Sequence, residues 1–196
     1  MKDLKLEQCI LDGSHCFFVG KIPDHLRLTS DGFCRLWSLH PPDYHEIKIH
    51  GRLVKTPRWQ QAYGTDYHYT GRVNTALPVP DILQPLHAWC RANIDERLNG
   101  LLLNWYDGSL GHYIGKHRDS TTNMCDGAPI ATVSFGETRV FRLRPWKDKT
   151  KRDFAATDGS IVVMPYATNL AWTHEVPKSA KYKSRRISVT LRAFNS

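Results

Sequence analysis

The run Arg186-Ile-Ser-Val-Thr-Leu-Arg192 alternates polar with aliphatic side chains along its whole length. Because successive side chains of a β-strand point to opposite faces, this run predicts a strand with one polar and one apolar face. The polar face carries Arg186, Ser188, Thr190 and Arg192. A guanidinium presents a planar fork that matches a carboxylate, so two arginines facing a common space predict a site for a dicarboxylate. An edge strand with a solvated basic face explains the same pattern.

Two histidines and an aspartate have the spacing of a metal site. His117 and Asp119 are two positions apart, so on an extended strand both side chains project from one face and can hold the same ion. His174 is the best candidate for a third ligand, because two imidazoles and one carboxylate on one face of an octahedral ion leave the opposite positions open. This set favours Fe(II). A His-x-Asp pair also arises by chance in a chain with 10 histidines, so the pair alone is weak.

These motifs belong to a longer series that the chain shares with one family. In chain order the series is Pro57-Arg-Trp-Gln60, Tyr67-His-Tyr69, Asn104-Trp-Tyr106-Asp-Gly108, Ile114-Gly-Lys-His117-Arg-Asp119, Pro129-Ile-Ala-Thr-Val-Ser-Phe-Gly136, Asn169-Leu-Ala-Trp172-Thr-His174 and the run from Arg186 to Arg192. In these residues the chain resembles the AlkB-type Fe(II)- and 2-oxoglutarate-dependent dioxygenases, especially the animal DNA-repair homologues. The resemblance covers residues 45 to 194.

The resemblance implies a role for each residue of the site. His117, Asp119 and His174 would hold Fe(II) and form the catalytic centre. Arg186 would pair with the distal carboxylate of 2-oxoglutarate, and Arg192 with the end nearer the metal. The residues expected to bind this co-substrate are Asn104, Tyr106, Arg186, Ser188 and Arg192, with Ser188 standing where relatives often have asparagine.

The resemblance also implies the reaction. With O2, such a site decarboxylates 2-oxoglutarate to succinate and CO2 and leaves a ferryl oxygen that removes hydrogen from a nearby carbon. If that carbon is an N-alkyl group on a base of DNA or RNA, the hydroxylated product collapses and releases an aldehyde.

A hairpin is expected where Ile47-Lys-Ile-His50-Gly51-Arg-Leu53 alternates and then turns. In the similar repair enzymes this hairpin carries an aromatic wedge that fills the gap left by a flipped base, and the aligned residue here is His50. Histidine offers a smaller and wetter face than phenylalanine, so single-stranded DNA or RNA gains weight as substrate. An ordinary exposed turn residue is the competing interpretation of His50.

Further substrate contacts are expected around this hairpin. Tyr67 and Tyr69 share a strand face, and Tyr69 stands where the family stacks a ring on the target base, although a buried core tyrosine fits the pattern too. The candidates for contacts to phosphate or base are Arg52, Lys55, Arg58, Arg118, Ser120 and the run Lys147-Asp-Lys-Thr-Lys-Arg152. That run is equally compatible with a solvated hairpin tip.

One departure from the family concerns the residues after His117-Arg-Asp119. The similar repair enzymes place an acidic residue there, against a cationic methylated base, whereas this chain has Ser120-Thr-Thr-Asn123. A hydroxyl or amide can hydrogen-bond to a base but does not supply a full negative charge. The substrate is therefore a neutral modified base, a different nucleic acid or another class of molecule.

Length and composition agree with one enzyme domain over residues 1–196. The resemblance implies that this domain has a nucleotide-recognition lid at 45–75 and a jelly-roll catalytic core at 100–194. The net charge of +8 favours nucleic acid as partner. The 5 cysteines show no Cys-x-x-Cys spacing, which argues against a disulfide framework and a zinc ribbon. No apolar run is long enough to span a membrane, so we expect a soluble, intracellular monomer without a membrane partner.

The predicted fold class is mainly β (α+β). One helix follows Thr29-Ser-Asp31, whose oxygens can cap it, and a second starts near Pro80-Asp81, with Pro85 confining it to the later portion. Past residue 100, short apolar or alternating runs separated by Gly, Pro and Asp indicate a sandwich or barrel. The resemblance selects the double-stranded β-helix, a jelly roll with buttressing N-terminal helices and a hairpin lid.

Two other functions remain open at the level of sequence. An oxygenase with the same iron site could act on a small molecule or a protein, which would leave the basic hairpin without a role. A noncatalytic nucleic-acid-binding relative could keep the fold, but the intact set of His117, Asp119, His174, Arg186 and Arg192 argues against it.

Overall fold

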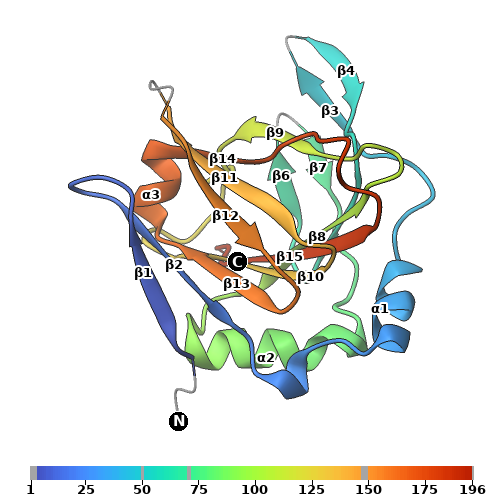
Figure 1. Cartoon of the computed structure of the whole chain (residues 1–196), viewed down its shortest axis with the longest axis horizontal. Helices are drawn as coiled ribbons and strands as arrows, with labels where there is room; N and C mark the ends of the chain where they lie inside the picture. The colour runs from blue at the N-terminus through green and yellow to red at the C-terminus, as the bar shows by residue number, and fades with distance from the viewer. Residues whose placement is uncertain (1–3, 50, 70–71, 147–149, 196) are drawn as a thin grey trace.

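Two antiparallel sheets pack against each other in the computed structural model, which describes residues 4–49, 51–69, 72–146 and 150–195 (Figure 1). The seven-stranded sheet consists, in spatial order, of β1 (Leu6–Ile10), β2 (Cys16–Lys21), β13 (Ser160–Met164), β10 (Ile130–Gly136), β15 (Arg185–Arg192), β8 (Gly100–Asp107) and β5 (Trp59–Tyr63). The four-stranded sheet consists of β12 (Arg152–Ala156), β11 (Arg139–Pro145), β14 (Trp172–Val176) and β9 (Ile114–His117). The predicted mainly β jelly roll is confirmed.

Strand β15 lies in the middle of the larger sheet, between β10 and β8. Its aliphatic face, which carries Ile187, Val189 and Leu191, is fully buried. Its polar face is buried as well and points into the space between the two sheets, where Arg186 and Arg192 are 1% and 3% exposed. The alternation was therefore interpreted correctly, and the alternative of a solvated edge strand is wrong.

The helices cover the outer face of the larger sheet. They are α1 (Ser30–Trp37) and α2 (Gln84–Asn93), preceded by 3-10 turns at Asp24–Leu26 and Asp81–Leu83. Thr29 caps α1 by accepting a hydrogen bond from the amide of Gly32, and Pro85 stands in the first turn of α2, where its missing amide costs nothing. Leu36, Trp37, Leu86 and Cys90 pack with the apolar face of β15. The buttressing helices are confirmed.

Two small hairpins stand beside the mouth between the sheets. They are β3 (Glu46–Ile49) with β4 (Arg52–Lys55), and β6 (Tyr67–Tyr69) with β7 (Arg72–Asn74). The predicted β3–β4 hairpin projects from the body in Figure 1, and Gly51 provides the positive φ of 79° that its turn requires. His50 lies outside the described residues.

Several elements were not predicted, among them β1, β2 and α3 (Tyr166–Ala171). Strands β1 and β2 extend the larger sheet beyond β13, and α3 connects β13 to β14. No helix among the described residues has the length and apolar character to cross a membrane.

Candidate active site

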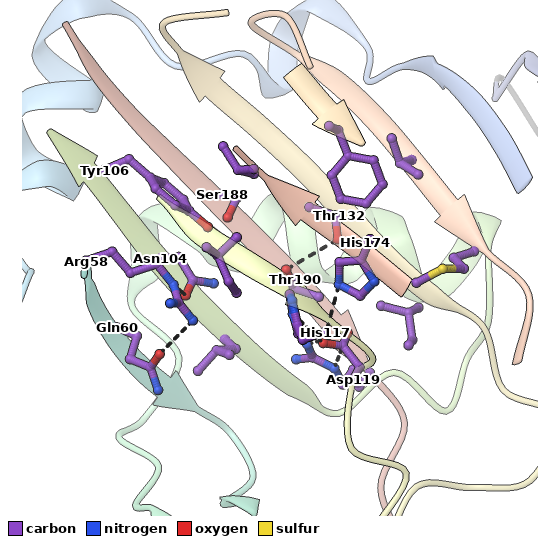
Figure 2. Close-up of a pocket in the computed structure, with 18 of the residues that line it drawn as sticks. Arg58, Gln60, Asn104, Tyr106, His117, Asp119, Thr132, His174, Ser188 and Thr190 are labelled. Atoms are coloured by element: carbon purple, nitrogen blue, oxygen red, sulfur yellow. Dashed lines mark hydrogen bonds and ion pairs between the residues drawn. The ribbon is translucent and has the colours of Figure 1, made fainter. Parts of the chain in front are cut away.

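Strands β9 and β14 bring two distant histidines together. The two strands pair so that His117 and His174 are direct neighbours, with ring centroids 4.3 Å apart. The Nε2 atoms of both rings lie 3.6 Å from Oδ1 of Asp119. Candidate ligand atoms of these three residues all lie within 4.8 Å of one another (Figure 2). The arrangement can hold one metal ion with two imidazoles and one carboxylate on the same side.

The two-residue spacing suggested that Asp119 lies on the same strand as His117. The strand β9 ends at His117, however, and Asp119 lies two residues beyond it. Its backbone is held from α3 instead. The amide of Asp119 donates to Oδ1 of Asn169 at 3.0 Å, and Nδ2 of Asn169 donates back to the Asp119 carbonyl at 3.1 Å. Asn169 is 1% exposed, so this pair of bonds is protected from water. Asn169 therefore fixes the position of the carboxylate without touching it.

Replacing Asn169 with alanine is expected to weaken Fe(II) binding by about 10- to 100-fold, the usual cost of losing a group that positions a ligand. Metal titration of the wild-type and Asn169→Ala proteins checks this. Asn93→Ala is a matched control, because Asn93 is bonded to its own helix at the Trp89 carbonyl, far from the triad. Equal affinities in all three proteins would contradict the positioning role.

The Asp119 carboxylate divides its two oxygens between different partners. Oδ1 faces the imidazoles, whereas Oδ2 accepts hydrogen bonds from Nε and Nη2 of Arg192 at 3.1 and 2.6 Å. Burial alone would raise the pKa of Asp119, but Arg192 and the two histidines outweigh burial and hold this pKa well below its usual value. Burial and the neighbouring His174 lower the pKa of His117. The set is thus an ionised carboxylate beside an imidazole that favours its neutral form, as a metal requires.

Arg186 offers an unsatisfied positive fork at the other end of the same cavity. Its Nη2 donates to Oγ of Ser134 at 2.8 Å, but Nε and Nη1 are buried and have no hydrogen-bond partner among the described residues. The face of Tyr106 lies 5.1 Å from the guanidinium carbon. Burial lowers the pKa of Arg186, and the neighbouring cation Arg139 acts in the same direction. A carboxylate entering this cavity would satisfy both nitrogens, so the residues fit a co-substrate with an acidic group at each end.

Comparison with known proteins gives a consistent result. The profile of the 2OG-Fe(II) oxygenase superfamily matches residues 33–192. The chain belongs to this superfamily. The human DNA oxidative demethylase ALKBH2 is 29% identical over 157 residues, which are 74% of this chain and 60% of the relative. The Arabidopsis thaliana protein of the same name is 31% identical over 176 residues, covering 74% and 56%.

Two further similarities extend this picture. The rat alpha-ketoglutarate-dependent dioxygenase alkB homolog 3 is 28% identical over 148 residues, which are 69% of this chain and 50% of the relative. The chain thus spans only part of the length of these relatives. The solved structure of OsALKBH1 superimposes with a TM-score of 0.59 at 13% identity, covering 95% of this chain and all of that one. These likenesses support an AlkB-type oxygenase with the predicted fold.

Membership of the 2OG-Fe(II) oxygenases implies Fe(II), 2-oxoglutarate and O2, and the residues present fit each of them. The triad could supply the metal ligands, and the two nitrogens of Arg186 that lack partners among the described residues suit the distal carboxylate of the co-substrate. Ser188 lies on β15 and lines the cavity on the same face as Arg186. Arg192 already donates to Asp119, so its expected contact with the inner end of 2-oxoglutarate stays a prediction.

Asn104 and Tyr106, both on β8, line the cavity as expected. Oδ1 of Asn104 accepts a hydrogen bond from Nε of Arg58 at 2.7 Å, and Nη2 of Arg58 donates to Oε1 of Gln60 at 3.0 Å (Figure 2). Arg58 is only 6% exposed. The expectation that Arg58 meets phosphate from a projecting loop therefore needs correction, because β8 and β5 hold its guanidinium inside the cavity.

The two tyrosines of β6 occupy different depths. Their rings stack with centroids 5.9 Å apart and an angle of 11° between planes. Tyr67 is buried, and Arg192 lies 4.5 Å from its ring centre, so Tyr67 packs as the core interpretation held. Tyr69 is half-buried and meets the edge of His117 at 6.3 Å between centroids. Tyr69 is thus the ring at the mouth of the metal site.

Arg118 and Ser120 lie outside this cavity, in an open hollow on the other side of Asp119. Arg118 donates to the Leu170 carbonyl at 2.6 Å and covers the ring of Trp146 at 4.5 Å. Ser120 donates to Oγ1 of Thr122. Sequence reasoning assigned no role to Asn169 or Trp146, although Asn169 opens the shared motif that ends at His174 and thus carried a signal.

Proposed function

We propose that this chain is an oxidative demethylase of N-alkylated nucleobases in DNA or RNA. The observation that carries the proposal is the buried Arg186 fork, open to a carboxylate, in the same cavity as the His117–Asp119–His174 triad. The names of the relatives, DNA oxidative demethylases among them, support nucleic acid as the substrate class. The net charge of +8 agrees with a polyanionic substrate.

Different residues of the chain would anchor the co-substrate, position the carboxylate ligand and shield the reacting carbon from water. Arg186 would orient the co-substrate by its distal carboxylate, and Asp119 would present Oδ1 to the iron while Arg192 holds Oδ2. Bound Fe(II) supplies the activation of oxygen that oxidises 2-oxoglutarate and the substrate. Apolar side chains exclude water from the reacting carbon. They are Leu102, Ile130, Phe141, Val162 and Met164.

Tyr69 would receive the target base. Its half-buried ring stands beside His117, so a base stacked on it places its substituents next to the metal ligands. Asp119 is the only carboxylate among the described residues that line the cavity, the hollow beside Arg118, and a second hollow between β9 and the β3–β4 hairpin. That carboxylate is committed to Arg192 and the histidines. The proposal therefore favours a base that is neutral, since no negative charge is available to attract a cationic one.

The test is turnover with a panel of methylated single-stranded and duplex DNA and RNA oligonucleotides, measured as succinate formation together with mass loss of each base. We expect one class of oligonucleotide to stimulate succinate formation and to lose its methyl group in equal amounts. Succinate formation that no oligonucleotide stimulates would move the substrate to a small molecule or a protein. If no oligonucleotide gives succinate, the assignment of dioxygenase activity to this chain is contradicted.

A further inference from the structure

An exposed tryptophan stands beside the mouth of the metal site. Of the six tryptophans, all within the described residues, Trp146 alone is exposed, at 52%. It follows directly after β11 and lines the open hollow that also contains His117 and Asp119. Large apolar side chains left in water beside a functional site commonly mark a binding surface.

Two cations hold the indole in place. The guanidinium carbon of Arg118 lies 4.5 Å from the ring centre and Nζ of Lys116 lies 5.6 Å from it. Lys116 also donates to the Trp146 carbonyl at 3.2 Å, and Arg118 donates to the Leu170 carbonyl. The ring is therefore oriented before any ligand arrives, and the cost of ordering it on binding is reduced.

The chemistry of this hollow points to an anion with a flat apolar group. Its exposed charges among the described residues are Lys116 and Arg118, whereas its one carboxylate, Asp119, is buried and paired with Arg192. A nucleotide combines a planar base with a phosphate, and aromatic rings flanked by basic side chains bind single strands in this way. A protein segment would need no such concentration of positive charge around a ring.

A second hollow continues the surface on which a single strand of nucleic acid can lie. It lies between the β3–β4 hairpin and β9, and it shares Tyr69, Lys116 and His117 with the hollow at Trp146. In Figure 1, β9 accordingly runs between that hairpin and α3. A single strand can thus pass from the hairpin across the mouth, where Tyr69 stands, to Trp146.

We infer that Trp146, flanked by Lys116 and Arg118, is a stacking platform for an unpaired base next to the target base of a single-stranded nucleic acid. The inference rests on the proposed function and adds that the nucleic-acid substrate is single-stranded around the target base. A base that is stacked in a duplex has no free face for the indole, so the platform selects a strand whose neighbouring bases are unpaired.

The experiment measures the affinity of the protein for three kinds of ligand. They are a short single-stranded oligodeoxythymidine, the same strand with one abasic position placed at each site in turn, and a blunt duplex. We expect Trp146→Ala to weaken binding of the intact strand by about tenfold, as loss of one stacked base does, and Trp146→Phe to recover most of it. One abasic position should weaken wild-type binding but leave Trp146→Ala unchanged. Duplex affinity should not depend on Trp146. Leu77→Ala, another exposed apolar residue but outside both hollows, is the control.

Salt dependence separates stacking from charge. Trp146→Ala should leave the slope of log affinity against log salt unchanged, whereas Lys116→Ala should reduce it by about 0.7, the value for one phosphate contact on a single strand. Strand binding should also quench the fluorescence of the wild type and not of Trp146→Phe.

Three results overturn the inference, and they differ in what else they affect. If the wild type demethylates a strand but Trp146→Ala binds and turns over that strand equally well, the platform is refuted and the proposed function stands. If the wild type neither binds nor demethylates any strand, both are refuted. Equal losses by Trp146→Ala on intact, abasic and duplex ligands would assign Trp146 a purely structural role and overturn the platform as well.

Discussion

Replacing Asp119 with asparagine is expected to abolish turnover and to reduce Fe(II) affinity by more than the roughly 100-fold that loss of an outer positioning group costs. The amide keeps the shape of the side chain but removes the negative charge that both the metal and Arg192 require. Metal titration and succinate formation, each with freshly prepared anaerobic protein, measure the two effects.

The same substitution has a second consequence, for stability. Arg192 is 3% exposed, and without its counter-charge it becomes a buried unpaired cation. Breaking one side of a buried ion pair costs about 3–5 kcal/mol. The double variant Asp119→Asn/Arg192→Met should therefore recover stability to thermal unfolding but no turnover. Asp81→Asn, at an exposed carboxylate outside the cavity, should change neither property. Full turnover by the Asp119→Asn protein would rule out the assigned iron site.

The face of β15 that carries the arginines shows what the sequence could predict. Its two-residue period identified the correct side chains and the common space that they share, because that period is a local property of the strand. The burial of both faces was not predictable from the run itself. It follows from β10 and β8 on either side and from the second sheet, which are contacts with residues distant in the sequence.

The metal site was also predictable only in part from the sequence. The spacing of His117 and Asp119 and the resemblance to a family identified the three candidate ligands that the structure brings together. The strand ends at His117, however, and the position of Asp119 depends on Asn169 and Arg192. A helix of six residues such as α3 is too short for a periodic pattern, so this support was not expected.

Surface features were the least predictable. The basic run after Trp146 attracted attention through its charge, yet its residues 147–149 lie outside the described residues, and Trp146 itself carried no signal. Its exposure, and the two cations beside it, come from the meeting of β9 with the end of β11. Strands β1 and β2 were missed because their side chains are only partly buried and show no clear alternation.

Replacing Arg186 with methionine is expected to raise the KM for 2-oxoglutarate by roughly 30-fold or more, since losing one side of a buried charged pair costs about 2–5 kcal/mol of binding. Methionine fills much of the same volume but offers no donor. Arg185→Met is the matched control, because the adjacent side chain is 55% exposed, pairs with Asp107 and lies over the ring of Trp37 outside the cavity. Its KM should stay at the wild-type value.

Two further measurements distinguish a lost anchor from general damage. Without co-substrate, the Arg186→Met protein should be at least as stable to thermal unfolding as the wild type. The reason is that the wild-type guanidinium buries its charge together with two nitrogens that have no partners among the described residues. Added 2-oxoglutarate should then raise the unfolding temperature of the wild type only.

The choice of co-substrate completes the test of Arg186. The wild type should strongly prefer 2-oxoglutarate to 2-oxopentanoate, which has the same chain length but lacks the distal carboxylate, and Arg186→Met should lose most of that preference. The reason is that the variant lacks the guanidinium assigned to the distal carboxylate, whereas the triad at the other end of the cavity is intact. A variant that still prefers 2-oxoglutarate as strongly as the wild type would place the distal carboxylate elsewhere, and Arg139, whose guanidinium also lies against Tyr106, would then be the next cation to test.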